Sequence, residues 1–286
     1  MRKSILIIGK IPPPIGGVTI HTYRLYINLK TKYKNVKLIS PKPMNLFKIL
    51  LFSFFYKNII IESKAFAKKS ILFYLILKKI FGKNIITVFH SLRDDPVKYK
   101  KVLKYSDHII SVNNEIKKRL NNVGVNSNIS VFSPFIPPTK EEKKFFKPFK
   151  YEKSPNEIII VFNAFKIIFE NNKDLYGLDT IIEFFSEISK KSKKYTLFLC
   201  IPQFDEKSRL YLNRLLGKYS LEMDNIKLWT DNYSLIDIFK ISDYFIRPTL
   251  SDGDALSIRE ANFFGVETIA SDCVKRPEFV HTYDVE

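Results

Sequence analysis

Cysteine, arginine and long apolar runs are all scarce in this chain of 286 residues. The only two cysteines, Cys200 and Cys273, cannot build a disulfide framework, so a reduced, cytoplasmic protein is expected. The apolar start is too short for a secretory signal peptide and is followed by a turn, which predicts a first buried strand over residues 4–8. These shortages disfavour a secreted, disulfide-stabilised protein.

The most apolar stretch, residues 46–56, is too short to cross a membrane. A spanning helix needs about 20 apolar residues, whereas Lys48 and Lys57 bracket only eight residues here. Two interpretations remain for this stretch and for residues 71–80. Packing into a core is favoured, and a helix lying in a membrane surface is the alternative.

Charge is divided unevenly along the chain. Residues 1–150 contain 30 Lys and Arg against 7 Asp and Glu, a net charge of +23, whereas residues 151–286 contain 17 against 22, a net charge of −5. Only nine of the 47 basic residues are Arg, the side chain that reads bases and phosphates best, so nucleic-acid binding is not expected. A basic first half favours an anionic membrane surface or a phosphorylated acceptor as partner, and a lysine-rich composition is the alternative explanation.

Strand and helix patterns alternate along the chain and indicate an α/β fold with parallel, doubly wound sheets. Buried strands are predicted over residues 4–8, 58–61, 85–89, 108–112 and 129–132, and again over 158–162, 196–201, 226–229, 244–246 and 268–270. Helices are predicted over 19–29, 46–56, 68–81 and 113–121, and over 178–189, 206–219, 234–240 and 255–264. A proline-rich and charged stretch separates the two series. The pattern therefore predicts a first domain over 1–140, a linker over 141–156 and a second domain over 157–286, with a cleft between the domains.

The most informative segment is residues 247–261, which sets Asp252 and Glu260 eight positions apart across a loop and the start of a helix. Gly253 allows close approach of the backbone to a ligand, and Asp254 or a neighbour is expected to cap the helix. Free N–H groups at a helix start bind anions. The layout fits a nucleotide sugar, with phosphates on the amides and hydroxyls on the acids.

This segment resembles the Glu-x7-Glu signature of the retaining glycosyltransferases of family 4, which have the GT-B fold, with Asp252 in place of the first Glu. Residues 265–272 and 276–278 resemble the strand and loop that close the donor pocket in that family. At the other end of the chain, residues 12–21 resemble the family's glycine loop after the first strand. The resemblance spans nearly the whole chain.

The resemblance implies a function for individual residues. It places Asp252 on the donor sugar, Glu260 on the ribose hydroxyls and His90, which follows a predicted strand, near the reacting sugar; His21 matches a histidine on the acceptor side. We predict His90 and Asp252 as catalytic residues. The predicted donor-binding residues are Gly16, Gly17, Lys166, Gly253, Asp254, Ala255, Leu256, Ser257 and Glu260.

The sequence departs from the family in three places. The family has an Arg after the first strand of this domain and a Lys further on, both on the diphosphate. Here the first region, residues 162–166, contains no Arg, Tyr176 stands where the Lys would be, and Lys166 is the predicted substitute for their charge. The family continues beyond the region that ends here at Glu286, so the second domain is expected to be incomplete. No metal or cofactor is implied, and a divalent ion on Asp252 and Asp254 is a minor alternative.

The sequence therefore predicts a glycosyltransferase that moves a sugar, with retention, from a nucleotide-sugar donor to a saccharide or lipid-linked acceptor, in the synthesis of a surface polysaccharide or glycolipid. The expected location is cytoplasmic, or peripheral on the inner face of the membrane. The alternative is a catalytically impaired, truncated homologue that acts as a membrane-surface or scaffold protein.

Overall fold

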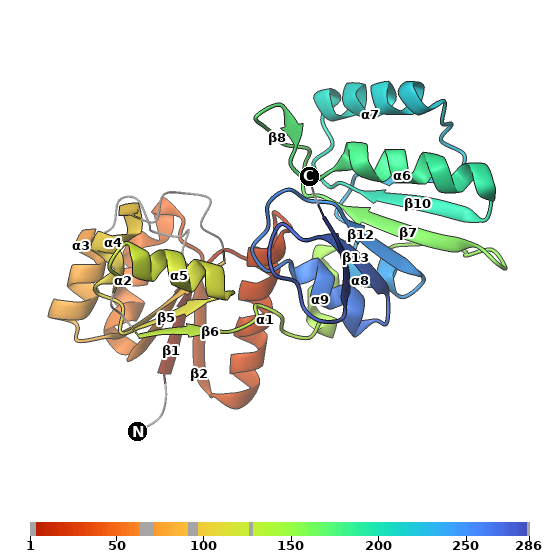
Figure 1. The fold of residues 1–286 in the computed structure, drawn as a ribbon. Helices are drawn as coiled ribbons and strands as arrows, with labels where there is room; N and C mark the ends of the chain where they lie inside the picture. The colour runs from red at the N-terminus through yellow and green to blue at the C-terminus, as the bar shows by residue number, and fades with distance from the viewer. Residues whose placement is uncertain (1–3, 63–70, 91–96, 126–127, 285–286) are drawn as a thin grey trace. The chain divides into compact units, whose positions relative to one another are not determined.

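The computed structural model describes residues 4–62, 71–90, 97–125 and 128–284, and the first three residues of the helix predicted over 68–81 lie outside them. The chain divides into two compact units, Met1–Ile136 and Pro137–Glu286. Each unit is built on one parallel sheet with helices on both faces (Figure 1). None of the described helices is both long enough and apolar enough to span a membrane.

The first unit alternates strands and helices as the sequence predicts, apart from residues 35–39 and 97–103, which were not predicted. Its strands are β1 (Ser4–Ile8), β2 (Asn35–Ile39), β3 (Asn58–Glu62), β4 (Asn84–Phe89), β5 (His108–Ser111) and β6 (Asn128–Val131). Its helices are α1 (Gly17–Lys32), α2 (Leu46–Phe55), α3 (Ile71–Leu75), α4 (Val97–Leu103) and α5 (Asn114–Asn122), with a short 3₁₀ turn η1 (Pro43–Asn45) and a π-helical turn η3 (Ile76–Ile80).

The first sheet has the order β2-β1-β3-β4-β5-β6 with every pair parallel. Alternate residues of one strand point to opposite faces. Leu6 and Ile8 accordingly pack with α2 and α3, whereas Ile5 and Ile7 pack against α1. Both faces of the central strands are therefore buried, which explains their continuous apolar runs.

The second unit repeats this architecture. Its strands are β7 (Ile158–Asn163), β10 (Tyr195–Cys200), β11 (Ile226–Trp229), β12 (Tyr244–Arg247), β13 (Glu267–Ser271) and β14 (Val280–Tyr283), and a small hairpin pairs β8 (Phe169–Glu170) with β9 (Lys173–Asp174). Its helices are η4 (Lys140–Phe145), α6 (Leu178–Lys191), α7 (Glu206–Tyr219), α8 (Leu235–Phe239) and α9 (Leu256–Phe263).

The second sheet has the order β11-β10-β7-β12-β13-β14, again with parallel pairing. Helices α6 and α7 cover one face, and α8 and α9 cover the other (Figure 1). Ile160 and Phe162 point to the first pair of helices, and Ile159 and Val161 to the second. This is the strand order of dinucleotide-binding Rossmann domains.

The structure differs from the sequence prediction at one edge of each sheet and in the linker. The edge strands β2 and β14 were not predicted, because each is only half covered and has no continuous apolar run. Residues 141–156, predicted as a linker, belong to the second unit instead. Phe149 and Tyr151 of that stretch pack on the core beside α8 and α9, since their rings find apolar surface there.

The favoured prediction of core packing for residues 46–56 holds for one face of α2 only. Ile49 lies in the core and Leu50 and Phe52 pack against it, whereas Ile49 and Ser53 are the only buried residues of the helix. Its exposed apolar side chains include Phe47, Phe54 and Phe55.

Candidate functional site

Both sheets contain a point at which the chain reverses the direction in which it adds strands. In open α/β sheets, ligands bind outside the carboxyl ends of the strands at such a point. The reversal lies between β1 and β3 in the first sheet and between β7 and β12 in the second. Each is bordered by a cluster of polar side chains.

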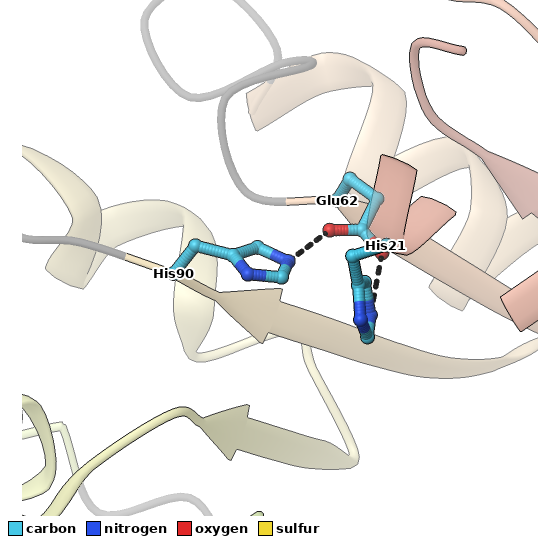
Figure 2. Close-up of side chains that lie close together, drawn as sticks. All are labelled: His21, Glu62 and His90. Carbon is cyan, nitrogen blue, oxygen red and sulfur yellow. Dashed lines mark hydrogen bonds and ion pairs between the residues drawn. The ribbon is translucent and has the colours of Figure 1, made fainter. Parts of the chain in front are cut away.

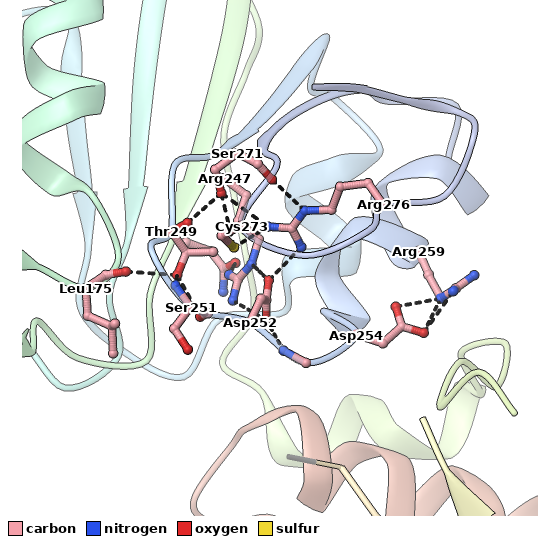
Figure 3. Close-up of polar contacts among 12 residues, drawn as sticks. Leu175, Arg247, Thr249, Ser251, Asp252, Asp254, Arg259, Ser271, Cys273 and Arg276 are labelled. Atoms are coloured by element: carbon pink, nitrogen blue, oxygen red, sulfur yellow. Dashed lines mark hydrogen bonds and ion pairs between the residues drawn. The ribbon is translucent and has the colours of Figure 1, made fainter. Parts of the chain in front are cut away.

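The cluster of the second unit joins two arginines to one carboxylate (Figure 3). Arg247, the last residue of β12, donates from Nε to Asp252 Oδ2 at 2.8 Å, and Arg276 donates from Nη1 to the same oxygen at 2.9 Å. Arg276 also donates from Nε to the backbone carbonyl of Ser271 at 2.7 Å. The side chains of Arg247, Asp252 and Arg276 are only 11 %, 9 % and 3 % exposed. This buried cluster carries one net positive charge.

The two arginines keep Asp252 ionised. Burial raises the pKa of its carboxyl, but the charges and hydrogen bonds of Arg247 and Arg276 outweigh burial and lower the pKa to about 2. Asp252 also accepts a hydrogen bond from the backbone N–H of Gly253 at 3.0 Å, which orders the loop before α9. Asp252 is therefore an anchored carboxylate at neutral pH.

Arg247 also contacts Asn163 and Tyr176, which lie in the two regions where the family resemblance predicts an Arg and a Lys. Its Nη1 donates to Asn163 Oδ1 at 3.3 Å, and its guanidinium carbon lies 5.9 Å from the centre of the Tyr176 ring, within reach of a cation–π contact. Lys166, the predicted substitute, is exposed, and its backbone pairs with Gln203. The structure therefore brings the guanidinium of Arg247 to both positions.

The sequence predicts that Asp254 or a neighbour caps α9, and the side chain of Asp254 does not do so. Both carboxylate oxygens of Asp254 accept from Arg259 Nε at 2.9 Å. A charge-assisted pair with an arginine one turn along the helix competes successfully with capping. The N-cap residue is Ala255, whose side chain cannot accept a hydrogen bond. The N–H groups in the first turn of α9 therefore receive no hydrogen bond from the side chain of the N-cap residue.

The remaining predicted residues of this segment lie on the inner side of α9. Leu256 and Ser257 are each 8 % exposed, and Glu260 is 6 % exposed. Binding of a donor by them stays a prediction. The minor alternative of a divalent ion on Asp252 and Asp254 is not supported, because both carboxylates are bound by arginines.

A glycine contact fixes the corner beside this cluster. Gly177 has a positive φ of 74°, and a Cβ there would lie 2.2 Å from the carbonyl oxygen of Pro248. Only glycine lets the start of α6 approach so closely. The carboxylate of Asp174 accepts hydrogen bonds from the backbone N–H groups of Tyr176 at 3.0 Å and Leu178 at 2.8 Å. Backbone N–H groups at the start of α6 therefore already have an acceptor within the chain.

The cluster of the first unit consists of His21, Glu62 and His90 (Figure 2). Glu62 ends β3, His90 directly follows β4, and His21 lies on α1. Glu62 Oε2 lies 2.7 Å from His90 Nε2, and Oε1 lies 3.7 Å from His21 Nε2. The two imidazole rings are 4.7 Å apart, centre to centre. Burial lowers the pKa of His21, against the attraction of Glu62 and together with the repulsion of His90.

Gly9 makes room for Glu62 at the carboxyl end of β1. A Cβ at this position would lie 2.8 Å from Glu62 Cγ and 2.8 Å from Thr22 Cγ2. The absence of a side chain there lets α1 and the end of β3 close together. The approach of His21 to Glu62 follows from this packing.

The glycine loop leads into α1. The N–H of Gly16 donates to Thr19 Oγ1 at 3.1 Å, which stabilises the helix start. A Cβ at Gly16 would meet nothing within 4 Å, so internal packing does not require glycine at this position. The predicted close approach of a ligand to Gly16 and Gly17 stays a prediction.

Three residues of these clusters, Glu62, Arg247 and Arg276, were not predicted as site residues, although Arg247 and Arg276 lie in the stretches 247–261 and 276–278 that the sequence analysis selected. Glu62 and Arg247 share one signal, since each is a charged residue at the carboxyl end of an apolar strand. The resemblance of residues 276–278 to a donor-pocket loop could have indicated Arg276, but its contact with Asp252 spans 24 positions of sequence and has no local signal.

The sequence matches no family model and no curated protein. Among solved structures, the chain is similar to a glycosyltransferase from Rickettsia africae, with 13 % identity, coverage of 99 % of this chain and 85 % of that chain, and a TM-score of 0.68. It is similar to sucrose-phosphate synthase from Thermosynechococcus elongatus, with 16 % identity, 99 % and 86 % coverage, and a TM-score of 0.69. It is also similar to Anabaena HepE in complex with UDP and glucose, with 11 % identity, 99 % and 86 % coverage, and a TM-score of 0.67.

These likenesses concern the fold, because the identities are low. They agree with the two parallel six-stranded sheets and their flanking helices. The chain has an α/β fold of the GT-B type, built from two Rossmann-like domains.

Proposed function

We propose that this protein is a glycosyltransferase that takes a sugar from a nucleotide-sugar donor, with the donor bound by the second unit. The observation that carries this proposal is the cluster of Arg247, Asp252 and Arg276 at the strand-order reversal of the second sheet, beside the start of α9. The fold of HepE, whose structure holds UDP and glucose, supports the same class of ligand.

The cluster has the chemistry that a diphosphate leaving group requires. A sugar leaves its nucleotide as negative charge develops on the phosphate oxygens, and fixed positive groups stabilise that charge. Arg247 and Arg276 outnumber the carboxylate between them, and the start of α9 adds the partial positive charge of a helix N-terminus. No metal ion is needed for this step. Glu260 is then the proposed partner of the ribose hydroxyls.

A binding assay over a panel of nucleotide sugars tests the donor site. Calorimetry should show one sugar nucleotide binding per chain, and Glu260→Gln should raise its dissociation constant about 10- to 150-fold, the equivalent of about 1.5 to 3 kcal/mol for a charge-assisted hydrogen bond. The matched control is Glu267→Gln, a carboxylate of the same unit that is 51 % exposed.

Two outcomes would contradict the proposal. Equal affinity of the Glu260→Gln and Glu267→Gln variants would remove Glu260 from the donor site. Failure of the unmodified chain to bind any sugar nucleotide would favour the alternative of a non-catalytic scaffold protein. We propose further that the transfer retains the anomeric configuration of the sugar and that the acceptor is a hydroxyl of a saccharide or a lipid-linked molecule. The anomeric configuration of the product by NMR tests the first, and transfer to each acceptor class tests the second.

We also propose that the first unit docks on an anionic membrane surface. Several large apolar side chains of α2, α3 and the turns beside them are 47 to 90 % exposed: Met44, Leu46, Phe47, Leu51, Phe54, Phe55, Leu72 and Ile80. The end of α2 meets the end of η3 through the rings of Phe54 and Phe81, 5.8 Å apart. Exposed Lys48, Lys57 and Lys79 accompany them. Apolar side chains rimmed by lysine fit a bilayer interface with acidic headgroups.

Sedimentation of the full chain with lipid vesicles tests this docking. Binding to vesicles that contain acidic lipid should exceed binding to neutral vesicles and should fall with salt, because each basic residue near such a surface contributes about 1 kcal/mol. Leu72→Ser should weaken binding, whereas the control Leu210→Ser, a 62 % exposed leucine on α7, should not. Equal binding to both vesicle types, or equal loss in both variants, would contradict the proposal.

A further inference from the structure

The cluster of His21, Glu62 and His90 contains two atoms that face each other and lack a proton to share, and one of them, Glu62 Oε1, is buried. His21 Nδ1 lies 2.7 Å from the carbonyl oxygen of Pro134. A carbonyl only accepts hydrogen bonds, so Nδ1 carries the proton and Nε2 of a neutral ring carries a lone pair. That lone pair faces Glu62 Oε1 at 3.7 Å (Figure 2).

Glu62 is left with an unsatisfied acceptor. Its side chain is 3 % exposed, and Oε1 has no hydrogen-bond partner among the residues that the structure describes. A buried acceptor without a partner destabilises the folded chain, because its lost hydrogen bonds to water are not replaced. Two acceptors that face each other inside a protein indicate a missing cation or proton between them.

The ligand set fits a metal ion. One donor atom of each of His21, Glu62 and His90 lies within 4.8 Å of the others, and this is the one such group of three found in the described part of the chain. Neighbouring ligands of a tetrahedral zinc ion lie about 3.3 Å apart, so side-chain shifts of about an ångström would close the set. Two histidines and one glutamate leave a fourth position open for water or a substrate oxygen.

The surroundings of the cluster are also those of a metal site. A metal-ligating histidine usually donates its second N–H to a carbonyl or carboxylate, as His21 does to Pro134. Glu62 and His90 stand at the ends of the adjacent parallel strands β3 and β4, and Gly9 lets Glu62 pack against α1. Rigid elements therefore hold all three ligands.

We propose that His21 Nε2, His90 Nε2 and a carboxylate oxygen of Glu62 bind a divalent transition-metal ion of the zinc type. This departs from the expectation that no metal is involved. It does not rest on the proposed glycosyl transfer, because the site belongs to the first unit alone and its test measures metal binding rather than activity.

Titration of the chelator-stripped full chain with Co²⁺ and Zn²⁺ tests the site. Co²⁺ should bind in a ratio of one ion per chain and show the visible absorption bands of a four-coordinate ion, and Zn²⁺ should displace it. Glu62→Gln should weaken Zn²⁺ binding more than the roughly 10- to 100-fold that loss of an outer-sphere partner causes. The matched control is His281→Ala, which removes an exposed histidine paired with Glu267 in the second unit and should leave affinity and stoichiometry unchanged.

A second variant guards against misfolding. His90→Gln keeps an N–H group that can donate to Glu62 but removes the imidazole ligand, so it should retain the circular dichroism spectrum and thermal melt of the unmodified chain while it loses tight Zn²⁺ binding. Absence of one-to-one binding in the unmodified chain overturns the proposal and makes the cluster an ion pair only. Undiminished Zn²⁺ binding by a folded His90→Gln variant also overturns it.

Discussion

Replacement of Asp252 by asparagine should destabilise the second unit strongly. Asp252 is the single carboxylate between Arg247 and Arg276, and all three side chains are nearly buried. Asparagine keeps the shape of the side chain but removes the negative charge. The two guanidinium groups would then face each other without the carboxylate between them.

The magnitude follows from the pKa of Asp252. A carboxyl whose pKa falls from 3.8 to about 2 on folding contributes about 2.5 kcal/mol to the free energy of unfolding at neutral pH. Removing one partner of a buried ion pair costs about 3 to 5 kcal/mol in other proteins, because the remaining charge stays buried. The expected loss is therefore about 2.5 to 5 kcal/mol. For a unit of this size the midpoint of thermal unfolding should fall by roughly 5 to 15 °C.

The single tryptophan of the chain makes the measurement specific. Trp229 lies on β11 and packs against the core of the second unit, so its fluorescence follows the unfolding of that unit. The control is Asp237→Asn, which breaks an exposed pair with Lys240 on α8 and should cost less than about 0.5 kcal/mol. Equal losses in Asp252→Asn and Asp237→Asn would refute the reasoning.

The same charge predicts a pH dependence with a definite sign. The folded pKa lies below the unfolded one, so the stabilisation by Asp252 is fully present above pH 3.8 and is lost as the pH falls toward about 2. The difference in stability between the unmodified chain and Asp252→Asn should therefore shrink between about pH 4 and pH 2. A constant difference across that range would show that the asparagine acts through packing rather than charge.

Two further predictions concern one structural and one proposed catalytic residue. Gly177→Ala should cost more than about 2 kcal/mol of stability, since the new methyl group meets the carbonyl oxygen of Pro248 and φ is positive; an unchanged melting curve by tryptophan fluorescence would contradict this contact. His90→Ala should lower kcat roughly 10- to 100-fold and change the donor dissociation constant much less, because a side chain beside the reacting sugar, whether free or metal-bound, contributes mainly in the transition state. Equal losses in the two constants would give His90 a structural role.

Much of the fold could be predicted from the sequence, because buried parallel strands are locally encoded. The predicted strands over 4–8 and 158–162 are apolar at every position except Ser4, since both faces of a central strand are covered, and the structure confirms both as strands. The edge strands β2 and β14 could not be predicted in this way. Each has one partner strand and is partly exposed, so its residues show no apolar run.

The candidate sites likewise contain some residues that the local sequence predicts and others that only tertiary contacts bring into the site. The sequence alone predicted Asp252 and Glu260 as site residues from the local spacing of residues 247–261, and His90 from its place at the end of a predicted strand and from the family resemblance. Only the tertiary structure brought Arg276 onto Asp252 and the guanidinium of Arg247 to Tyr176.

The cluster of the first unit depends on tertiary structure even more strongly. Its residues, His21, Glu62 and His90, are separated by 41 and 28 positions and come from one helix and the ends of two strands. The pairing of β3 with β4 and the small side-chain volume of Gly9 bring them together. A local pattern records which residue types are present and how they are spaced. Strand order and packing decide which of them share a site, because these depend on contacts between distant parts of the chain.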